Sequence, residues 1–302
     1  MSRPAATDAF APEPRPLAVL GGVALWLGVT VVVSALAAPP LFHAIQSVAP
    51  GSFPFERVFR RVAMLVALVH LIVWLRRAGV RSWAAAGFTS EGWRRGRVAL
   101  VAGIGLASAA AMMIVDVLAG ARLPELGLSA AGAAKAILGA TLIGLVEEGA
   151  VRGALVFPFG RIAGAWRVAV VTLLCAVYST GHFARTRGGF EVVDWTSGFE
   201  LWQRTLDSAL ASPEPWIGLF ALGLLFDTLA RRQGHVWGAV ALHAGAVAGI
   251  QLGSDLTANV PGHPSLFFTN GLHPSWLLAA ILGVATIAVA FAGRARSDPE
   301  RV

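Results

Sequence analysis

The chain has 302 residues, of which 56% are hydrophobic and 14% charged, and its formal net charge is +7. Soluble domains carry roughly 25% charged residues, so this composition excludes an ordinary soluble domain and indicates lipid as the solvent. Nearly all of the positive charge is arginine at the ends of apolar runs, which is typical of membrane proteins and argues against nucleic acid as a partner. The single cysteine, Cys175, excludes an internal disulfide and a cysteine-based zinc site.

Apolar runs follow one another along the whole chain. A spanning helix needs about 20 mostly apolar residues, and only helices or closed barrels satisfy backbone groups in lipid. The runs do not alternate as barrel strands do. We therefore predict an all-α polytopic membrane protein, a bundle of about eight transmembrane helices with an intramembrane active-site cavity. The predicted spans are Leu17–Ala38, Val62–Leu75, Val98–Leu118, Ala131–Phe157, Val168–His182, Trp216–Ala230, Val236–Leu252 and Trp276–Ala292.

The arginines predict the orientation of these spans. With eight spans, most interfacial arginines fall on the side of the N-terminus, which should be cytoplasmic together with the C-terminus. The exception is the group Arg57, Arg60 and Arg61, which precedes the second span on the opposite side. The lack of an evident targeting segment and of any lysine other than Lys135 favours a bacterial inner membrane.

Four regions divide the chain. A polar tail covers residues 1–15, the first three helices residues 16–129, the predicted catalytic core residues 130–252, and a loop, the eighth helix and a basic tail residues 253–302. Within the core, residues 185–214 are polar, but four apolar side chains recur at helical spacing: Phe199, Trp202, Leu206 and Leu210. This pattern predicts a short amphipathic helix that lies on the membrane surface or packs on its neighbours.

The fourth span contains the charged sequence Glu147-Glu148-Gly149-Ala150-Val151-Arg152. A charge in the centre of a membrane helix costs at least about 2.5–3.5 kcal/mol, so these groups need partners. Glu148 and Arg152 are four residues apart and share one helix face, where they can pair. Glu147 is rotated by about 100° from Glu148 and is left to face another element. Gly149 and Gly153 have the small-xxx-small spacing that lets two helices approach closely.

Two histidines lie on other apolar spans, His182 at the end of the fifth and His243 in the seventh. A lone intramembrane histidine is more often an interhelical hydrogen-bonding residue than a catalyst. Glu147, His182 and His243 together, on three helices, instead suggest a site that activates water. They can do so directly or around a divalent metal such as zinc, because two histidines and one glutamate are a known zinc ligand set.

These motifs resemble the CPBP family, also called the Abi or CAAX prenyl protease 2-like family. The family's Glu-Glu-x-x-x-Arg motif is matched by Glu147, Glu148 and Arg152, and its Phe-x-x-x-His motif by Tyr178 and His182. Its third motif begins at His243. The resemblance covers residues 130–252 and implies an eight-helix intramembrane endopeptidase. It implies that Glu147 activates water with His182, that His243 binds the water or the oxyanion, and that Glu148 and Arg152 hold the site together.

The chain departs from the family pattern at two positions. Val247 stands where the family has Asn, and Gln251, on nearly the same helix face, is a candidate substitute for that amide. Tyr178 replaces the family's Phe and adds a hydroxyl one turn from His182, where it either orients this histidine or is an aromatic core residue.

Three functional readings follow from the sequence. The first is a protease that cleaves membrane-anchored proteins or peptides, with bacteriocin-type peptides favoured over prenylated proteins because prenylation is not expected in bacteria. The second is a proton-coupled transporter, since intramembrane Glu and His form proton relays. The third is a non-catalytic membrane scaffold, which would explain Glu148 and Arg152 but not Glu147 or the histidines. The sequence leaves the oligomeric state open.

Overall fold

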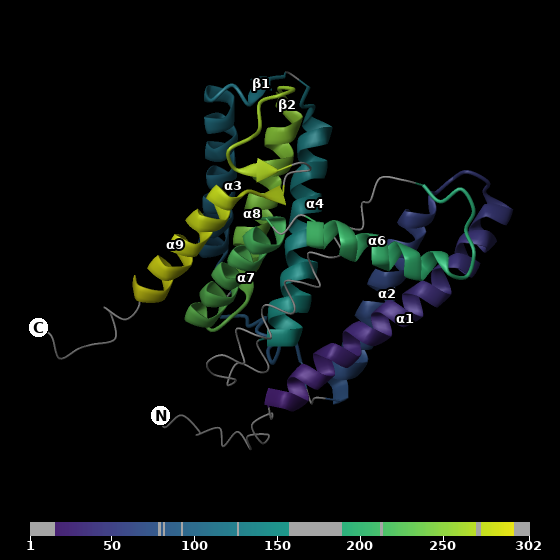
Figure 1. Ribbon diagram of the computed structural model, residues 1–302. Coiled ribbons are helices and arrows are strands. Elements are labelled where there is room, and N and C mark those ends of the chain that lie inside the picture. The colour runs from purple at the N-terminus through teal and green to yellow at the C-terminus, as the bar shows by residue number, and fades with distance from the viewer. Residues whose placement is uncertain are drawn as a thin grey trace, which may run out of the picture.

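A computed structural model describes residues 16–156, 189–211, 214–269 and 273–292, apart from residues 78, 79, 81, 92 and 126. This part of the chain is mostly helical (Figure 1). Its helices are α1 (Pro16–Val48), α2 (Phe55–Arg77), α3 (Arg95–Leu118), α4 (Ala130–Glu148), the π-helix η1 (Gly149–Val156), α6 (Ser197–Ala211), α7 (Glu214–Gln233), α8 (Trp237–Asp255) and α9 (Trp276–Ala292). The predicted span Val168–His182 lies outside the described residues.

The seven other predicted spans each correspond to a helix, although several boundaries differ. The last agrees at both ends, whereas α2 begins at Phe55, seven residues before the predicted start, and so contains the three arginines that the prediction assigned to the preceding loop. Among the described residues, four helices are long and apolar enough to cross a membrane: Gly21–Val48, Phe55–Arg77, Arg95–Leu118 and Ala130–Gly153. A mainly helical, membrane-embedded fold is therefore confirmed.

Two short antiparallel ladders lie outside the all-α prediction. β1 (Arg122–Pro124) pairs with β2 (Thr257–Asn259), and β3 (Phe268–Thr269) pairs with β4 (His273–Pro274). Arg122 of β1 is buried, and its side chain bonds to β2. Its Nε–H donates to Thr257 Oγ1 (2.6 Å) and its Nη1–H to Asn259 Oδ1 (2.7 Å). The first ladder ties the end of α3 to the end of α8 (Figure 1).

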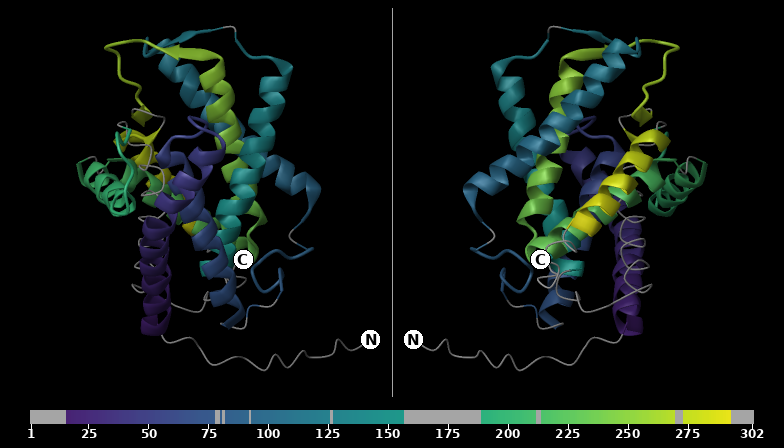
Figure 2. Two further views of the ribbon diagram at one scale, coloured as in Figure 1. Left: turned by 90° about the vertical axis from the view of Figure 1, so that its right-hand side faces the viewer. Right: turned by 90° about the vertical axis from the view of Figure 1, so that its left-hand side faces the viewer.

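Helices α3, α4 and α8 form the centre of the bundle, and α7 and α9 lie beside them (Figures 1 and 2). Glycines allow this close packing. A Cβ atom added to Gly144 of α4 would lie 2.9 Å from the Val240 carbonyl oxygen of α8, and one added to Gly245 of α8 would overlap the Ala102 carbonyl of α3. The backbones of α4 and α8 are therefore in contact just before the paired glutamates, which brings His243 within reach of them.

The glycine pair that follows the glutamates has another role than the predicted helix packing. A Cβ on Gly149 would lie 3.2 Å from the Phe88 ring, and one on Gly153 would lie 3.1 Å from the same ring and 3.0 Å from the Ala86 carbonyl oxygen. Phe88 belongs to the connection between α2 and α3, and its ring also packs on Trp237 at the start of α8 (5.1 Å between centroids). This pair therefore accommodates a connecting segment under η1 instead of a second helix.

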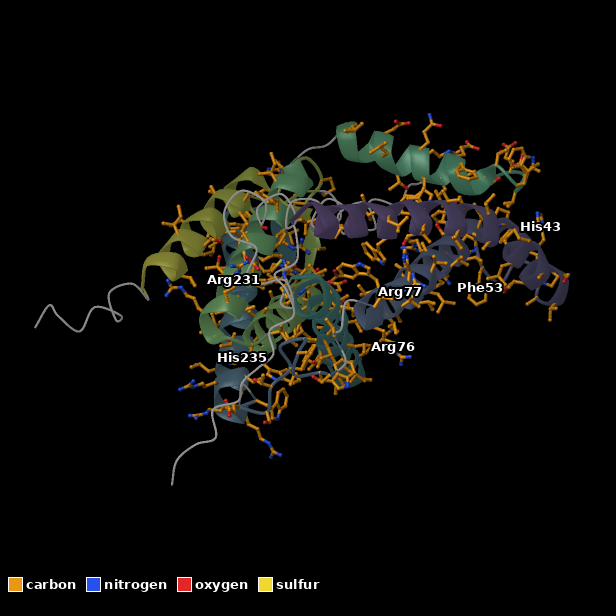
Figure 3. The ribbon with its side chains drawn as sticks, turned by 90° about the horizontal axis from the view of Figure 1, so that it is seen from below. His43, Phe53, Arg76, Arg77, Arg231 and His235 are labelled. Atoms are coloured by element: carbon orange, nitrogen blue, oxygen red, sulfur yellow. The ribbon has the colours of Figure 1, made fainter. Side chains whose placement is uncertain are left out.

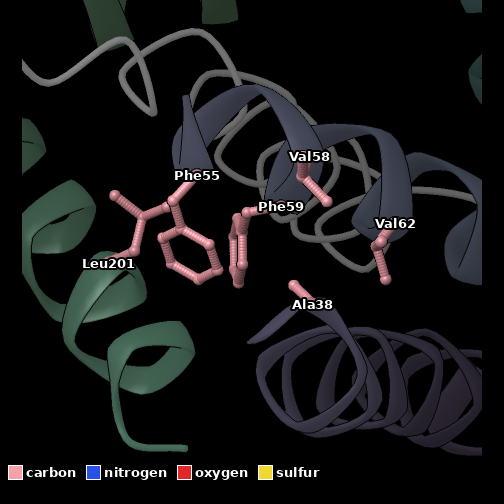
Figure 4. Packing of buried hydrophobic residues seen from close by; sticks show 6 residues of the cluster. All are labelled: Ala38, Phe55, Val58, Phe59, Val62 and Leu201. Carbon is pink, nitrogen blue, oxygen red and sulfur yellow. The ribbon is translucent and has the colours of Figure 1, made fainter. Parts of the chain in front are cut away.

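Helix α6 packs on α1 and α2. Gly198 lies so close to α1 that an added Cβ would overlap the Ala35 backbone. Leu201 is fully buried in an apolar cluster that these three helices share (Figure 4). The buried members of this cluster are Ala38, Phe55, Val58, Phe59, Val62 and Leu201.

A helix is present within the predicted amphipathic segment, but its main packing face differs from the prediction. Trp202 packs on Phe59 (5.6 Å between ring centroids) and donates to Ser34 Oγ (3.2 Å). The other apolar residues of the predicted face remain exposed, namely Phe199, Leu206 and Leu210. At 3.6 residues per turn they lie on the side opposite Leu201. The helix is therefore docked on α1 and α2 and keeps a second, exposed apolar stripe.

Candidate active site

Helix α4 changes into the π-helix η1 directly after the two glutamates. The α-helix ends at Glu148, and the wider turns of η1 run from Gly149 to Val156 and include Arg152. π-Helical segments are rare and are frequently found at functional sites. This change of helix type therefore coincides with the charged motif that the sequence singled out.

Glu148 is the buried centre of the site. It is completely buried, and its Oε1 accepts hydrogen bonds from Arg152 Nη1–H (3.0 Å) and from the His243 ring (2.8 Å). The ion pair expected from the spacing of Glu148 and Arg152 is thus present. Nδ1 of the His243 ring therefore faces Glu148, and Nε2 lies on the other side of the ring.

Glu147 lies on the other side of the same imidazole. Its Oε2 is 3.4 Å from His243 Nε2, and its side chain is 23% exposed, compared with 1% for that of Glu148. When the imidazole is neutral and Glu147 is ionised, both of these atoms are proton acceptors. Two acceptors this close together repel each other unless a proton lies between them or a donor binds to both. A water molecule is such a donor, because it carries two hydrogens. Glu147 is the less buried of the two carboxylates, although its Oε2 atom is itself buried.

Helix α7 supplies two residues, Gly223 and Phe226, whose contacts with the site the sequence did not reveal. The Gly223 carbonyl oxygen accepts from Arg152 Nη2–H (2.9 Å). The Phe226 ring, which is buried, stacks on the His243 ring with 5.1 Å between centroids and an interplanar angle of 24°. On the same ring lies the Arg152 guanidinium, 5.4 Å from the centroid. Phe226 therefore fixes both partners of Glu148. No motif marks Phe226, because an apolar residue in an apolar helix has no distinguishing signal.

We expect Phe226→Leu to lower the activity of the folded protein more than its stability loss explains. Leucine fills much of the space, but it cannot stack on His243 or attract the Arg152 guanidinium. An aromatic pair contributes about 0.5–1.5 kcal/mol, which corresponds to about a two- to tenfold loss of rate if it positions the reacting group. The measurement is the rate, per folded molecule, of the peptide cleavage that the sequence resemblance implies. The control is Phe267→Leu, a buried phenylalanine in another apolar cluster; equal rates for the two variants would contradict this role.

The remaining predicted site residues are not part of this group. Tyr178 and His182 lie outside the described residues, so the structure places neither. Gln251 lies on α8, eight residues after His243 and hence about 12 Å farther along the helix axis. Within the described part of the chain it makes no hydrogen bond to the other site residues.

A metal centre would need more donors than the described part of the site offers. Glu148 Oε1 and His243 Nδ1 already bond to each other, which leaves Glu147 and His243 Nε2, 3.4 Å apart, as the two candidate donors among these groups. Zinc sites use three or four protein ligands. In the described ranges no group of three or more His, Cys, Asp and Glu side chains has an arrangement that could hold a metal ion. A metal would therefore require a further ligand besides Glu147 and His243.

Comparison with known proteins relates this site to a protease family. Residues 129–248 match the family described as type II CAAX prenyl endopeptidase Rce1-like. No curated protein and no solved structure matches the chain. The matched segment begins just before α4 and ends within α8, so it contains both glutamates, Arg152 and His243. This match supports membership in the family of CAAX-type membrane proteases, the CPBP family, whose Glu-Glu-x-x-x-Arg motif the segment carries.

Proposed function

We propose that the protein is an intramembrane endopeptidase that hydrolyses peptide bonds in membrane-anchored proteins or peptides, with water activated by Glu147. The observation that carries this proposal is the arrangement around His243. One of its nitrogens is bound to the buried Glu148–Arg152 pair, and the other faces the more exposed Glu147 at 3.4 Å. A site that only stabilised the bundle would not need a second carboxylate at this position.

The hydrolysis follows from these contacts. A water that binds beside Glu147 and His243 Nε2 gives one proton to the Glu147 carboxylate while its oxygen attacks the carbonyl carbon of the scissile peptide bond. The protonated Glu147 then gives that proton to the leaving nitrogen as the carbon–nitrogen bond breaks. Glu148 keeps the His243 proton on Nδ1 throughout, so that Nε2 stays available to the water. Arg152 and Phe226 hold Glu148 and the imidazole in place.

The other predicted residues enter this scheme as proposals. His182 would activate the water together with Glu147, His243 would bind the water or the oxyanion, and Tyr178 would orient His182. Gln251 would replace the family's amide by contacting the substrate farther along α8. The substrates we favour are bacteriocin-type peptides or anchored proteins of a bacterial inner membrane. If His182 approached Glu147 and His243, it would supply the third ligand for a divalent metal.

The proposal is tested by incubating the full chain, purified in lipid nanodiscs, with a membrane-tethered reporter peptide. We expect the wild type to cleave it. His243→Asn should lose about a hundredfold or more, in line with the loss of a general acid–base group or its partner, because Asn cannot face Glu148 and Glu147 at once. His182→Ala should behave similarly, whereas Gln251→Ala should be milder.

Two further measurements separate the alternatives. Proton flux into proteoliposomes, without cleavage of any reporter, would support a transporter and contradict the protease. A chelator arm addresses the metal: cleavage that is lost with chelator and restored by zinc would show that the activity needs a metal, for which His182 is the proposed third ligand. Cleavage that persists would show that Glu147 and the histidines act on water directly.

A further inference from the structure

The arginines at the start of α2 form a group that the proposed chemistry does not use. Arg57 and Arg61 are both exposed and lie four residues apart on one face of the helix. The same face continues down the helix as exposed apolar residues: Met64, Leu65, Leu68 and Ile72. The third arginine, Arg60, lies on another face, where its Nε–H donates to the Glu56 carbonyl oxygen (3.4 Å). We call the face from Arg57 to Ile72 the α2 stripe.

Protein carboxylates do not neutralise the two arginines of the α2 stripe within the described residues. The ion pairs there involve other arginines, namely Arg152, Arg204 and Arg231. The nearest carboxylate in the sequence, that of Glu56, has its Oε1 atom buried in the protein. The Arg57 guanidinium instead lies over the exposed Phe53 ring, 5.8 Å from its centroid. These two charges therefore face outward beside an aromatic ring, as basic and aromatic side chains do at a membrane interface.

The dimensions of the α2 stripe fit one lipid. Arg61 and Ile72 are eleven residues apart, or about 16 Å along the helix axis. One leaflet contributes about half of a hydrocarbon core that is about 30 Å thick. If acyl chains cover the apolar part of the stripe, the two guanidinium groups lie at the level of the phosphate. Arginine binds phosphate oxygens through a planar fork of N–H donors.

We propose that the α2 stripe is a binding site for an anionic phospholipid, with the headgroup phosphate held by Arg57 and Arg61 and an acyl chain along Leu65, Leu68 and Ile72. This site also explains the arginines that oppose the predicted orientation. Anionic headgroups attract basic residues on either side of a membrane, so a bound lipid compensates their charge there. The inference is independent of the proposed peptidase chemistry.

The test measures lipid binding to the full chain in detergent, by native mass spectrometry and by thermal unfolding. Phosphatidylglycerol is compared with phosphatidylcholine of the same acyl chains, and inorganic phosphate is a separate arm. We expect the wild type to retain phosphatidylglycerol preferentially and to be stabilised by it. Arg57→Ala/Arg61→Ala should weaken this binding by about fivefold for each arginine. The matched control is Arg76→Ala/Arg77→Ala, which removes the same charge at the opposite end of α2 from Phe53 (Figure 3) and should keep the preference.

Three results would overturn the site: equal retention of the two lipids by the wild type, equal losses in the test and control variants, or an effect of inorganic phosphate as large as that of the lipid. If the double alanine variant does not fold, Arg57→Gln and Arg61→Gln are measured singly, and mass spectrometry counts bound lipids independently of stability. Retained preference in both single variants would equally contradict the proposal.

Discussion

We expect Glu147→Gln to keep the fold and to lose on the order of a hundredfold or more in peptide cleavage, because general-base catalysis contributes roughly 10²–10⁴-fold. Gln nearly matches Glu in shape, and its amide can donate to His243 Nε2, which lies 3.4 Å from the Glu147 carboxylate. The His243 ring should therefore keep its place. The amide cannot accept a proton from water, so the attack on the peptide carbonyl loses its base.

The matched control for this variant is the same substitution one residue along. Glu148→Gln removes the charge that Arg152 and His243 both contact at the buried Oε1 atom. It should lower folded yield and thermal stability, whereas Glu147→Gln should not. Cleavage by Glu147→Gln at nearly the wild-type rate would sink the proposed mechanism. A Glu147→Gln protein that fails to fold would instead show that Glu147 is a structural residue.

The second large effect is on stability. Arg152→Ala should destabilise the folded protein by about 3–5 kcal/mol, the usual cost of leaving a buried charge without its partner. Glu148 is fully buried, and Arg152 is its cationic partner at 3.0 Å, with further support from the Gly223 carbonyl oxygen and the Phe226 ring. The expected result is a low yield of folded protein and a lower unfolding midpoint. The double variant Glu148→Gln/Arg152→Ala should recover part of the stability, because neither charge of the buried pair remains.

An exposed ion pair of the same spacing provides the comparison. Arg204 and Glu200 on α6 are also four residues apart, but their side chains are 39% and 48% exposed. Exposed pairs contribute only about 0.2–1 kcal/mol, so Arg204→Ala should change the unfolding midpoint little. The measurement is thermal unfolding of the purified variants in the same detergent. Similar midpoints for Arg152→Ala and Arg204→Ala would show that the buried pair is not a main support of the fold.

Arg57 and Arg61 are an exception to the orientation that the other arginines predict. The last turns of α2 and α7 are both basic, with Arg76 and Arg77 on α2 and Arg231 and Arg232 on α7. The side on which these turns lie remains a prediction from the arginines. Reporter fusions after Arg95 and after Arg232 should both indicate the cytoplasm.

The sequence alone determined the features that depend on composition and on neighbours within one helix. The apolar run between Pro274 and Arg294 was predicted to form a helix buried in lipid or protein, because proline and arginine limit it on both sides. Helix α9 begins and ends at the predicted residues. The pairing of Glu148 with Arg152 was likewise predictable, because residues four apart on a helix are neighbours whatever surrounds them.

Only the tertiary structure decided which groups from distant segments meet. The rotation between Glu147 and Glu148 suggested that the two face different partners, yet one imidazole from α8 contacts both, since its two nitrogens lie on different sides of the ring. The space beside the two glycines of η1 is filled by the Phe88 ring and not by a second helix. A glycine in the sequence shows only that a neighbour can come close, and not which element that neighbour belongs to. The stacking of Phe226 on His243 likewise follows from the path of α7. Helix periodicity fixes which residues share a face, but the choice of neighbouring helix depends on packing across the whole bundle.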